Sequence, residues 1–290
     1  MRRRPLTIFI KTAAMIRMIR PELPAAAGLC VVVGQFIALG KLPSISSAGL
    51  GFLLGFFLSS SAMVFNDYFD LEVDRINAPQ RPFPAGLLSQ AEVIALGAFT
   101  AVAGWVVALA IHPIALFLSL VTWALGFLYN WKAKAAGLWG NLIVSASVGM
   151  TFVLGGVSVG QAARPMLWIF ALIAFIFDLA EEIAGDAMDI AGDQKRSSRS
   201  IAILWGKRTA LRISAVLFGG MVLLTIFPVI WGEVGLAYLV PFTLTDALII
   251  FFTYKLLTSQ TPGEGRGSMR SLYLCATVGL LAFILGTFIR

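Results

Sequence analysis

Apolar runs of membrane-spanning length, separated by short polar joints, are the main pattern of this chain. A helix needs about 20 predominantly apolar residues to cross a bilayer. Runs of about that length lie at residues 23–40, 48–66, 91–111, 113–130, 139–159, 165–184, 209–231, 236–255 and 270–289. The pattern predicts an all-α polytopic membrane protein, with about nine transmembrane helices bundled around a central cavity in a single domain of residues 1–290.

The first 20 residues follow a different pattern, because basic side chains interrupt the apolar ones. Lys11, Arg17 and Arg20 lie among apolar positions, so the segment does not resemble a cleavable signal peptide. A basic amphipathic helix of this kind lies in the membrane interface. We therefore expect residues 1–20 to form an interfacial helix that leads into the first span.

The distribution of basic residues predicts the orientation of the spans. Cytoplasmic joints of membrane proteins carry an excess of Lys and Arg. With nine spans and a cytoplasmic amino terminus, all but three of the 22 basic residues fall on the cytoplasmic side, the exceptions being Lys41, Arg164 and Arg290. We expect a multi-pass protein of the cell membrane with its amino terminus in the cytoplasm.

Composition agrees with this class and narrows the partners. The 290 residues are 59% hydrophobic and 13% charged, and the mean hydropathy is +0.88, whereas soluble domains are nearer half apolar and about a quarter charged. The net charge of +7 comes from the basic joints, so we expect membrane lipids and not nucleic acid as partners. Cys30 and Cys275 lie inside apolar runs without a C-x-x-C spacing, which argues against a disulfide framework or a zinc site.

A dense acidic stretch follows the second apolar run. Residues 66–86 read NDYFDLEVDRINAPQRPFPAG, with four carboxylates within eight residues. Successive helical residues turn by about 100°, so Asn66, Asp70 and Asp74 would fall within roughly 80° of one another. Asp67 would adjoin that stripe. The stretch predicts one helix face of hard oxygen ligands at the end of a span.

A second acidic stretch has the same design at the end of the sixth run. Residues 177–199 read FDLAEEIAGDAMDIAGDQKRSSR. On a helix, Asp186, Asp189 and Asp193 would share one narrow face with Glu182. Ionisable groups at membrane depth are costly and by default mark functional sites. Two such stretches on the same side of the membrane therefore predict a shared site.

Basic residues follow each acidic stretch: Arg75 and Arg81 after the first, and Lys195, Arg196 and Arg199 after the second. Magnesium prefers carboxylate and amide oxygens and keeps positions for water or phosphate oxygens, while Lys and Arg bind phosphate directly. We expect residues 66–90 and 185–208 to be cytoplasmic motif loops that bind a metal-bridged diphosphate. The apolar and aromatic spans between them would suit a long hydrocarbon tail.

Further motifs extend the two acidic stretches into an ordered series. They are Asn66-Asp67-x-x-Asp70-x-x-x-Asp74, Arg81-Pro82-x-Pro84-x-Gly86, Tyr129-Asn130 with Lys132 and Lys134, Gly140-Asn141, and Asp186-x-x-Asp189-x-x-x-Asp193 with Gly192 and Lys195. This series resembles the UbiA superfamily of intramembrane prenyltransferases over essentially the whole chain. The resemblance implies a nine-helix fold, two Mg²⁺ ions, a polyprenyl diphosphate donor, a lipophilic acceptor and release of diphosphate.

By motif position, the resemblance also implies roles for residues of this chain. One Mg²⁺ would be bound by Asn66, Asp70 and Asp74, and the other by Asp186, Asp189 and Asp193. The diphosphate would be held by Arg20, Arg81, Lys195 and one of Lys132 and Lys134, with support from Tyr129. The expected catalytic residues among these are Asp70, Asp193, Lys132, Lys134 and Tyr129. The spacing leaves open which of the two lysines contacts the diphosphate.

The implied chemistry is electrostatic. Positive charge around the departing diphosphate would let the allylic C–O bond ionise, and an acceptor would then attack the carbocation in a dry aromatic cavity. Residues 182–196 are most similar to digeranylgeranylglyceryl phosphate synthases, which add a second geranylgeranyl group to a glycerol phosphate ether in archaeal lipid synthesis. Departures from the common motifs at Glu22, Ala85 and Ser200 leave an aromatic, quinone-precursor or chlorophyllide acceptor open.

Two functions of other classes remain as alternatives. A transporter uses intramembrane carboxylates as well, but transporters place such sites near the midplane and not at span ends beside basic loops. A terpene cyclase on the same scaffold would ionise the same donor without a second acceptor. Two further acids lie inside spans: Asp178 is a candidate for positioning or deprotonating an acceptor, and Asp246 is expected to face the cavity or to pair with Thr243 or Thr245.

Overall fold

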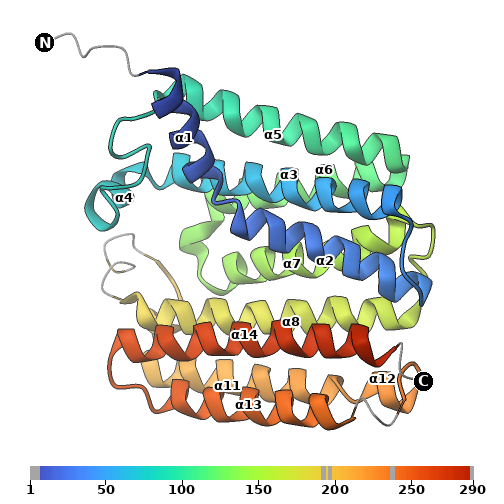
Figure 1. The fold of residues 1–290 in the computed structure, drawn as a ribbon. Coiled ribbons are helices and arrows are strands. Elements are labelled where there is room, and N and C mark those ends of the chain that lie inside the picture. The colour runs from blue at the N-terminus through green and yellow to red at the C-terminus, as the bar shows by residue number, and fades with distance from the viewer. Residues whose placement is uncertain (1–6, 191–193, 195–197, 236–238, 288–290) are drawn as a thin grey trace, which may run out of the picture. The chain divides into compact units, whose positions relative to one another are not determined.

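The computed structural model describes residues 7–190, 194, 198–235 and 239–287. Within these residues every regular element is a helix, which confirms the all-α prediction. The long helices are α2 (Glu22–Leu39), α3 (Ile45–Phe69), α5 (Gln90–Ile111), α6 (Pro113–Trp131), α7 (Leu138–Ser158), α8 (Pro165–Met188), α11 (Lys207–Leu224), α13 (Leu239–Leu257) and α14 (Pro262–Gly286) (Figure 1). The short elements are α1 (Ile8–Ile19), α4 (Leu71–Asn77), η1 (Ala133–Ala136), α10 (Ile201–Trp205) and α12 (Phe227–Ile230).

Eight helical stretches in the described part of the chain are long and apolar enough to cross a membrane. They are α2, α3, α5, α6, α7, α13, α14 and the stretch Lys207–Ile230, which contains α11 and α12. The remaining long helix, α8, has 24 residues but carries Asp178, Glu181 and Glu182 in its second half. It corresponds to the sixth predicted span, so the protein is a multi-pass membrane protein with the predicted order of helices.

The last helix begins at Pro262, and not near residue 270 as the apolar run predicts. The hydroxyl of Thr261 accepts a hydrogen bond from the N–H of Glu264 at 3.2 Å and caps the helix. Pro262 is tolerated in the first turn, where its missing N–H has no helical partner to lose. Because the first turns also carry Arg266, hydropathy alone does not reveal this part of α14.

The chain folds as two compact units. The first comprises residues 1–131 and 150–167, and the second comprises residues 132–149 and 168–290, so α7 and α8 each contribute to both. In the first unit α3 packs between α2 and α5 (Figure 1). A Cβ on Gly55 of α3 would lie 2.7 Å from the carbonyl oxygen of Ala27, so glycine permits this close contact with α2.

In the second unit α13 packs against both α11 and α14. The core around the end of α8 is apolar and includes Ile183, Ala184, Leu211, Phe218 and Leu272. This core holds the half of α8 that carries the second acidic stretch. The acidic side chains are therefore placed by helix packing and not by a surface loop.

Candidate active site

Asn66, Asp70 and Asp74 form one column along the helix axis. The N–H of Asp70 donates to the carbonyl oxygen of Asn66 at 3.0 Å, and the N–H of Asp74 donates to the carbonyl oxygen of Asp70 at 2.8 Å. These bonds carry the helical register across the short break between α3 and α4. The backbone therefore has the one-sided spacing that the sequence predicts, and Asp70 and Asp74 are both buried.

Asp67 is more deeply buried and has two arginine partners. Its side chain is 1% exposed. Nη2 of Arg20 donates to Oδ1 of Asp67, and Nη1 of Arg81 lies 3.5 Å from the same oxygen. Nη1 of Arg81 also donates to Oδ2 of Asp74 at 2.6 Å. A buried carboxylate is tolerated when it is paired and hydrogen-bonded in this way.

The carboxylates also act on the charge state of Arg81. Desolvation by burial lowers the pKa of Arg81, but the hydrogen bond to Asp74 and the negative charges of Asp67, Asp74 and Asp70 raise it by more. The net shift of its pKa is upward, so the guanidinium keeps its charge at this site. A permanent positive charge is what binding a phosphate group requires.

A compact turn after α4 places Arg81. The N–H of Ala85 donates to the carbonyl oxygen of Arg81 at 3.0 Å, and the chain leaves the turn through Gly86, whose φ of +71° suits a glycine. Phe83, inside the turn, is buried and stacks on Tyr68 of α3 with ring centroids 6.3 Å apart. Burial of this ring fixes the turn, and with it the position of Arg81.

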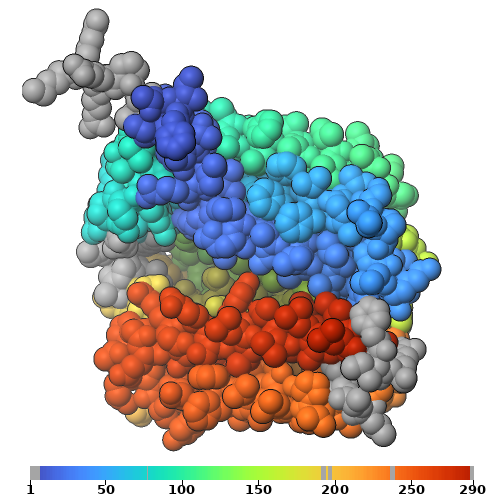
Figure 2. Space-filling model, viewed as in Figure 1, coloured from blue at the N-terminus to red at the C-terminus, as the bar shows by residue number. Residues whose placement is uncertain are grey.

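Helix α1 lies over the same turn and places Arg20. Met18 of α1 is buried in one apolar cluster with Phe83, and the dark blue atoms of α1 lie beside the cyan atoms that follow α3 in Figure 2. Lys11 pairs with Glu92 at the start of α5. Arg20 ends the helix with φ +53°, and within the described residues it is the one non-glycine residue with positive φ. The interfacial position of residues 1–20 stays a prediction, and residues 1–6 lie outside the described part.

The second acidic stretch is ordered by α7. Nδ2 of Asn141 donates to Oδ2 of Asp186 at 2.9 Å. The continuous helix through Asp193 that the sequence analysis assumes ends at Met188. The N–H of Asp189 is shared between the carbonyl oxygens of Gly185 and Asp186, which is common at helix ends. Asp189 is exposed and pairs with Arg266 of α14.

Two residues expected in the site lie outside the described part of the chain: Asp193, an expected metal ligand and catalytic residue, and Lys195, an expected diphosphate contact. Tyr129 lies near the end of α6 and is half-buried. Lys132 precedes η1 and Lys134 lies within it. The structure thus places both lysines on the connection between α6 and α7.

The two further acids have local partners. Oγ of Ser145 lies 2.9 Å from Oδ2 of Asp178, to which it donates. Asp246 accepts a hydrogen bond at 2.9 Å from the hydroxyl of Thr225, at the end of α11. The expected pairing with Thr243 or Thr245 is therefore wrong, because both of those hydroxyls donate to carbonyl groups of their own helix.

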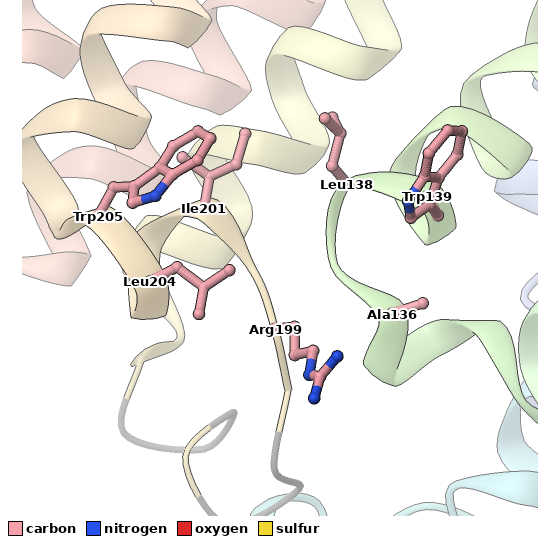
Figure 3. Close-up of a pocket in the computed structure, with 7 residues that line it drawn as sticks. All are labelled: Ala136, Leu138, Trp139, Arg199, Ile201, Leu204 and Trp205. Atoms are coloured by element: carbon pink, nitrogen blue, oxygen red, sulfur yellow. The ribbon is translucent and has the colours of Figure 1, made fainter.

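A separate cavity of about 350 Å³ lies where α7 begins, beside α10 (Figure 3). It is lined by Ala136, Leu138, Trp139, Arg199, Ile201, Leu204 and Trp205. The N–H of Arg199 donates to the carbonyl oxygen of Ala135 at 3.0 Å and fixes the backbone there. The lining is apolar except for Arg199 and contains none of the acidic motif residues, so this cavity is not the expected diphosphate site.

The donor set of the first stretch fits a magnesium ion. Asn66, Asp70 and Asp74 offer amide and carboxylate oxygens, the hard ligands that Mg²⁺ prefers. Within the described residues, no three side chains of His, Cys, Asp or Glu are gathered as one metal-holding cluster. Arg81 balances the charge of Asp74 in this set, and Arg20 and Arg81 balance the neighbouring Asp67.

The sequence model of the UbiA prenyltransferase family matches residues 27–275. This chain belongs to that family. The match confirms the resemblance and identifies the protein as a prenyltransferase of the UbiA family. The family match therefore favours the prenyltransferase over the transporter that the sequence analysis left as an alternative.

Relatives of this UbiA-family chain align over nearly their full length. A digeranylgeranylglyceryl phosphate synthase of Methanopyrus kandleri is 35% identical over 273 residues, which cover 93% of this chain and 98% of that protein. A digeranylgeranylglyceryl phosphate synthase of Thermococcus sibiricus is 31% identical over 272 residues, which cover 94% of this chain and 96% of that protein.

Solved structures of the family share the fold. A structure from work on digeranylgeranylglyceryl phosphate synthase in membranes has a TM-score of 0.79 at 29% identity and covers 97% of this chain and 99% of its own. A UbiA homologue from Archaeoglobus fulgidus, bound to GPP and Mg²⁺, has a TM-score of 0.65 at 18% identity and covers 95% and 98% of the two chains. The second likeness shows the fold alone.

Some contacts of this UbiA-family site are absent from the sequence analysis. Asp67 appears there only as a neighbour of the acidic stripe, yet it joins Arg20 and Arg81. Asn141 appears only within a motif, yet it bonds Asp186. A polar residue inside an otherwise apolar span was the available signal for Asn141. No sequence signal reveals the partners of Asp67, because they come from distant segments.

Proposed function

We propose that this UbiA-family enzyme transfers a geranylgeranyl group from geranylgeranyl diphosphate to geranylgeranylglyceryl phosphate. The observation that carries the choice of acceptor is the near full-length similarity to enzymes named digeranylgeranylglyceryl phosphate synthase, at 31% and 35% identity. The acidic and basic side chains around Asp67 support the choice of a diphosphate donor.

In this proposal the basic residues hold the diphosphate. Arg20 and Arg81, which pair with Asp67, are two of these residues, and Lys195 and one of Lys132 and Lys134 are the others. Tyr129 supports the diphosphate from the end of α6. Fixed positive charge around the leaving group lowers the barrier to breaking the C–O bond.

Two magnesium sites complete the proposal. Asn66, Asp70 and Asp74 would hold one ion, and Asp186, Asp189 and Asp193 the other. Magnesium, when bound, supplies positive charge that stabilises the departing diphosphate. Asn141 orients Asp186 through its hydrogen bond, in the way that second partners of metal ligands fix ligand orientation.

The reaction breaks the bond between C1 of the prenyl chain and the bridging oxygen of diphosphate, which leaves with the electron pair. The hydroxyl oxygen of the glycerol unit then forms a new C–O bond to C1 and loses its proton. The apolar and aromatic spans that the sequence predicts around the site would exclude the water that otherwise captures the carbocation. The products are the doubly prenylated glycerol phosphate, inorganic diphosphate and a proton.

The orientation in the membrane belongs to the same proposal. With the amino terminus in the cytoplasm, both motif loops open to the compartment in which a soluble diphosphate is released. Single cysteines at Ser44 and Ser259 would test this in intact cells. We expect only the cysteine at position 44 to react with a membrane-impermeant maleimide, and the opposite labelling would reverse the topology.

The acceptor is tested with purified protein, magnesium and geranylgeranyl diphosphate. Separate reactions would receive geranylgeranylglyceryl phosphate, 4-hydroxybenzoate, homogentisate, dihydroxynaphthoate or chlorophyllide, with products measured by mass spectrometry. We expect one geranylgeranyl group to be added to the glycerol phosphate ether. Addition only to an aromatic compound or chlorophyllide would reject this acceptor. A cyclised hydrocarbon without an acceptor would reject transfer itself.

A further inference from the structure

Asp67 differs from Asp70 and Asp74 in what surrounds it. Its side chain is 1% exposed, whereas those of its partners Arg20 and Arg81 are 23% and 34% exposed. An anion from the aqueous side can therefore reach the guanidinium groups of the two arginines, while the carboxylate of Asp67 is shielded from solvent. Asp67 is better placed to hold the arginines than to bind a ligand itself.

The contacts with carboxylates use one terminal nitrogen of each guanidinium. Arg20 uses Nη2 for Asp67, and Arg81 uses Nη1 for Asp67 and Asp74. A guanidinium carries five N–H donors in a rigid fork. Fixing one nitrogen against a buried carboxylate therefore sets the direction of the remaining donors, as required for binding phosphate oxygens with two parallel bonds.

The backbone of Arg20 is a second, independent observation. Arg20 has φ +53° and ψ +67°, and its N–H donates to the carbonyl oxygen of Ile16 at 3.2 Å as the cap of α1. Glycine adopts this left-handed conformation without strain, whereas a side chain there costs free energy. Strain of this kind is kept where the surroundings enforce it, commonly at functional sites. The guanidinium is the part of Arg20 that glycine would not provide.

Other contacts hold both arginines near Asp67. Lys11 of α1 pairs with Glu92 of α5, and Phe83 is buried in the turn that carries Arg81. Both arginine backbones are thus anchored by contacts that do not involve Asp67. Removing the Asp67 charge should release the two side chains while leaving their backbone anchors in place.

We propose that Asp67 is a positioning residue that aims Arg20 and Arg81 at the diphosphate of the prenyl donor and does not bind magnesium. The inference rests on the proposed function only for the diphosphate donor and does not depend on the acceptor. It separates Asp67 from Asp70 and Asp74, although all three lie in one motif. Each of the two roles has its own experimental signature.

The test compares Asp67→Asn with the matched control Glu72→Gln, whose carboxylate is exposed and pairs only with Arg75 among the described residues. Three quantities are measured: the KM for geranylgeranyl diphosphate, the affinity for inorganic diphosphate by calorimetry, and the Mg²⁺ concentration for half-maximal activity. We expect Asp67→Asn to raise the KM for the donor and to weaken the affinity for inorganic diphosphate, each by roughly 10- to 100-fold, as misplaced binding groups do. The Mg²⁺ concentration for half-maximal activity should change far less.

A large rise in the Mg²⁺ requirement with unchanged diphosphate affinity would make Asp67 a metal ligand and overturn the inference. Unchanged values for all three quantities would overturn it as well. If Asp67→Asn does not fold, Arg20→Lys tests the same point, since it keeps the charge but loses the fork; weaker diphosphate affinity supports the inference, and wild-type affinity overturns it. Calorimetry with inorganic diphosphate needs no turnover, so failure of the proposed acceptor would be seen separately.

Discussion

Asn141 of α7 donates a hydrogen bond from Nδ2 to Oδ2 of Asp186 on α8, with a distance of 2.9 Å. Both residues belong to the second unit. The bond fixes the rotation of the carboxylate. The side-chain amide of Asn141 is thus a direct partner of the second acidic stretch.

Loss of this amide should reduce turnover without unfolding the protein. We expect Asn141→Ala to lower kcat/KM by about 10- to 100-fold, the usual effect of removing a group that orients a metal ligand. Ser147→Ala is the matched control on α7, because in the described part of the chain the Ser147 hydroxyl donates to the carbonyl oxygen of Ile143 in the same helix. Equal losses in the two variants would show a general effect on α7.

The buried column of the first stretch should be essential. We expect Asp70→Asn to lower kcat by roughly 100-fold or more, because a neutral amide in place of a carboxylate weakens the charge stabilisation on which ionisation depends. Glu72→Gln, two residues away and exposed, should retain activity. Turnover by Asp70→Asn close to that of the control would remove Asp70 from the metal site.

Removal of divalent ions should abolish activity reversibly. Chelation followed by gel filtration should leave an inactive enzyme, and added Mg²⁺ should restore the initial rate. Ca²⁺ should restore less, because it prefers longer bonds and more ligands than Mg²⁺. Full turnover after exhaustive metal removal would contradict the magnesium assignment.

Gly137 should not tolerate a side chain. Its φ is +61°, and an added Cβ would overlap the carbonyl group of Arg199. We expect Gly137→Ala to destabilise the protein by roughly 1–3 kcal/mol and to lower activity, since the same connection carries Lys134. Gly126→Ala, where no atom would lie within 4 Å of the new Cβ, should leave the melting temperature equal or higher.

The strained backbone of Arg20 allows a comparison of two variants that both lack the guanidinium. We expect Arg20→Gly to melt at a higher temperature than Arg20→Ala, by the equivalent of about 1 kcal/mol, because only glycine accepts φ +53° without strain. Both variants should bind inorganic diphosphate weakly. A higher melting temperature for Arg20→Ala would mean that the left-handed conformation is absent from the native protein in detergent.

Sequence alone determined the order of the long helices and the spacing of the first acidic stretch, because these depend on near neighbours. In a bilayer each backbone polar group must be satisfied within its own helix, so apolar runs of sufficient length report the spans directly. The spacing of Asn66, Asp70 and Asp74 likewise follows from helical geometry, even though α3 ends at Phe69, between the first of these residues and the other two.

Only the tertiary structure decided which polar and charged side chains contact one another. Arg20 and Asp67 are 47 residues apart, and Asn141 and Asp186 are 45 residues apart, so no local periodicity relates them. The rotation of a helix that is apolar on all sides also cannot be read from its pattern. Met18 of α1 and Phe83 pack in one apolar cluster, and this packing brings Arg20 and Arg81 to the buried carboxylate of Asp67. Only side-chain packing across distant segments specifies that arrangement.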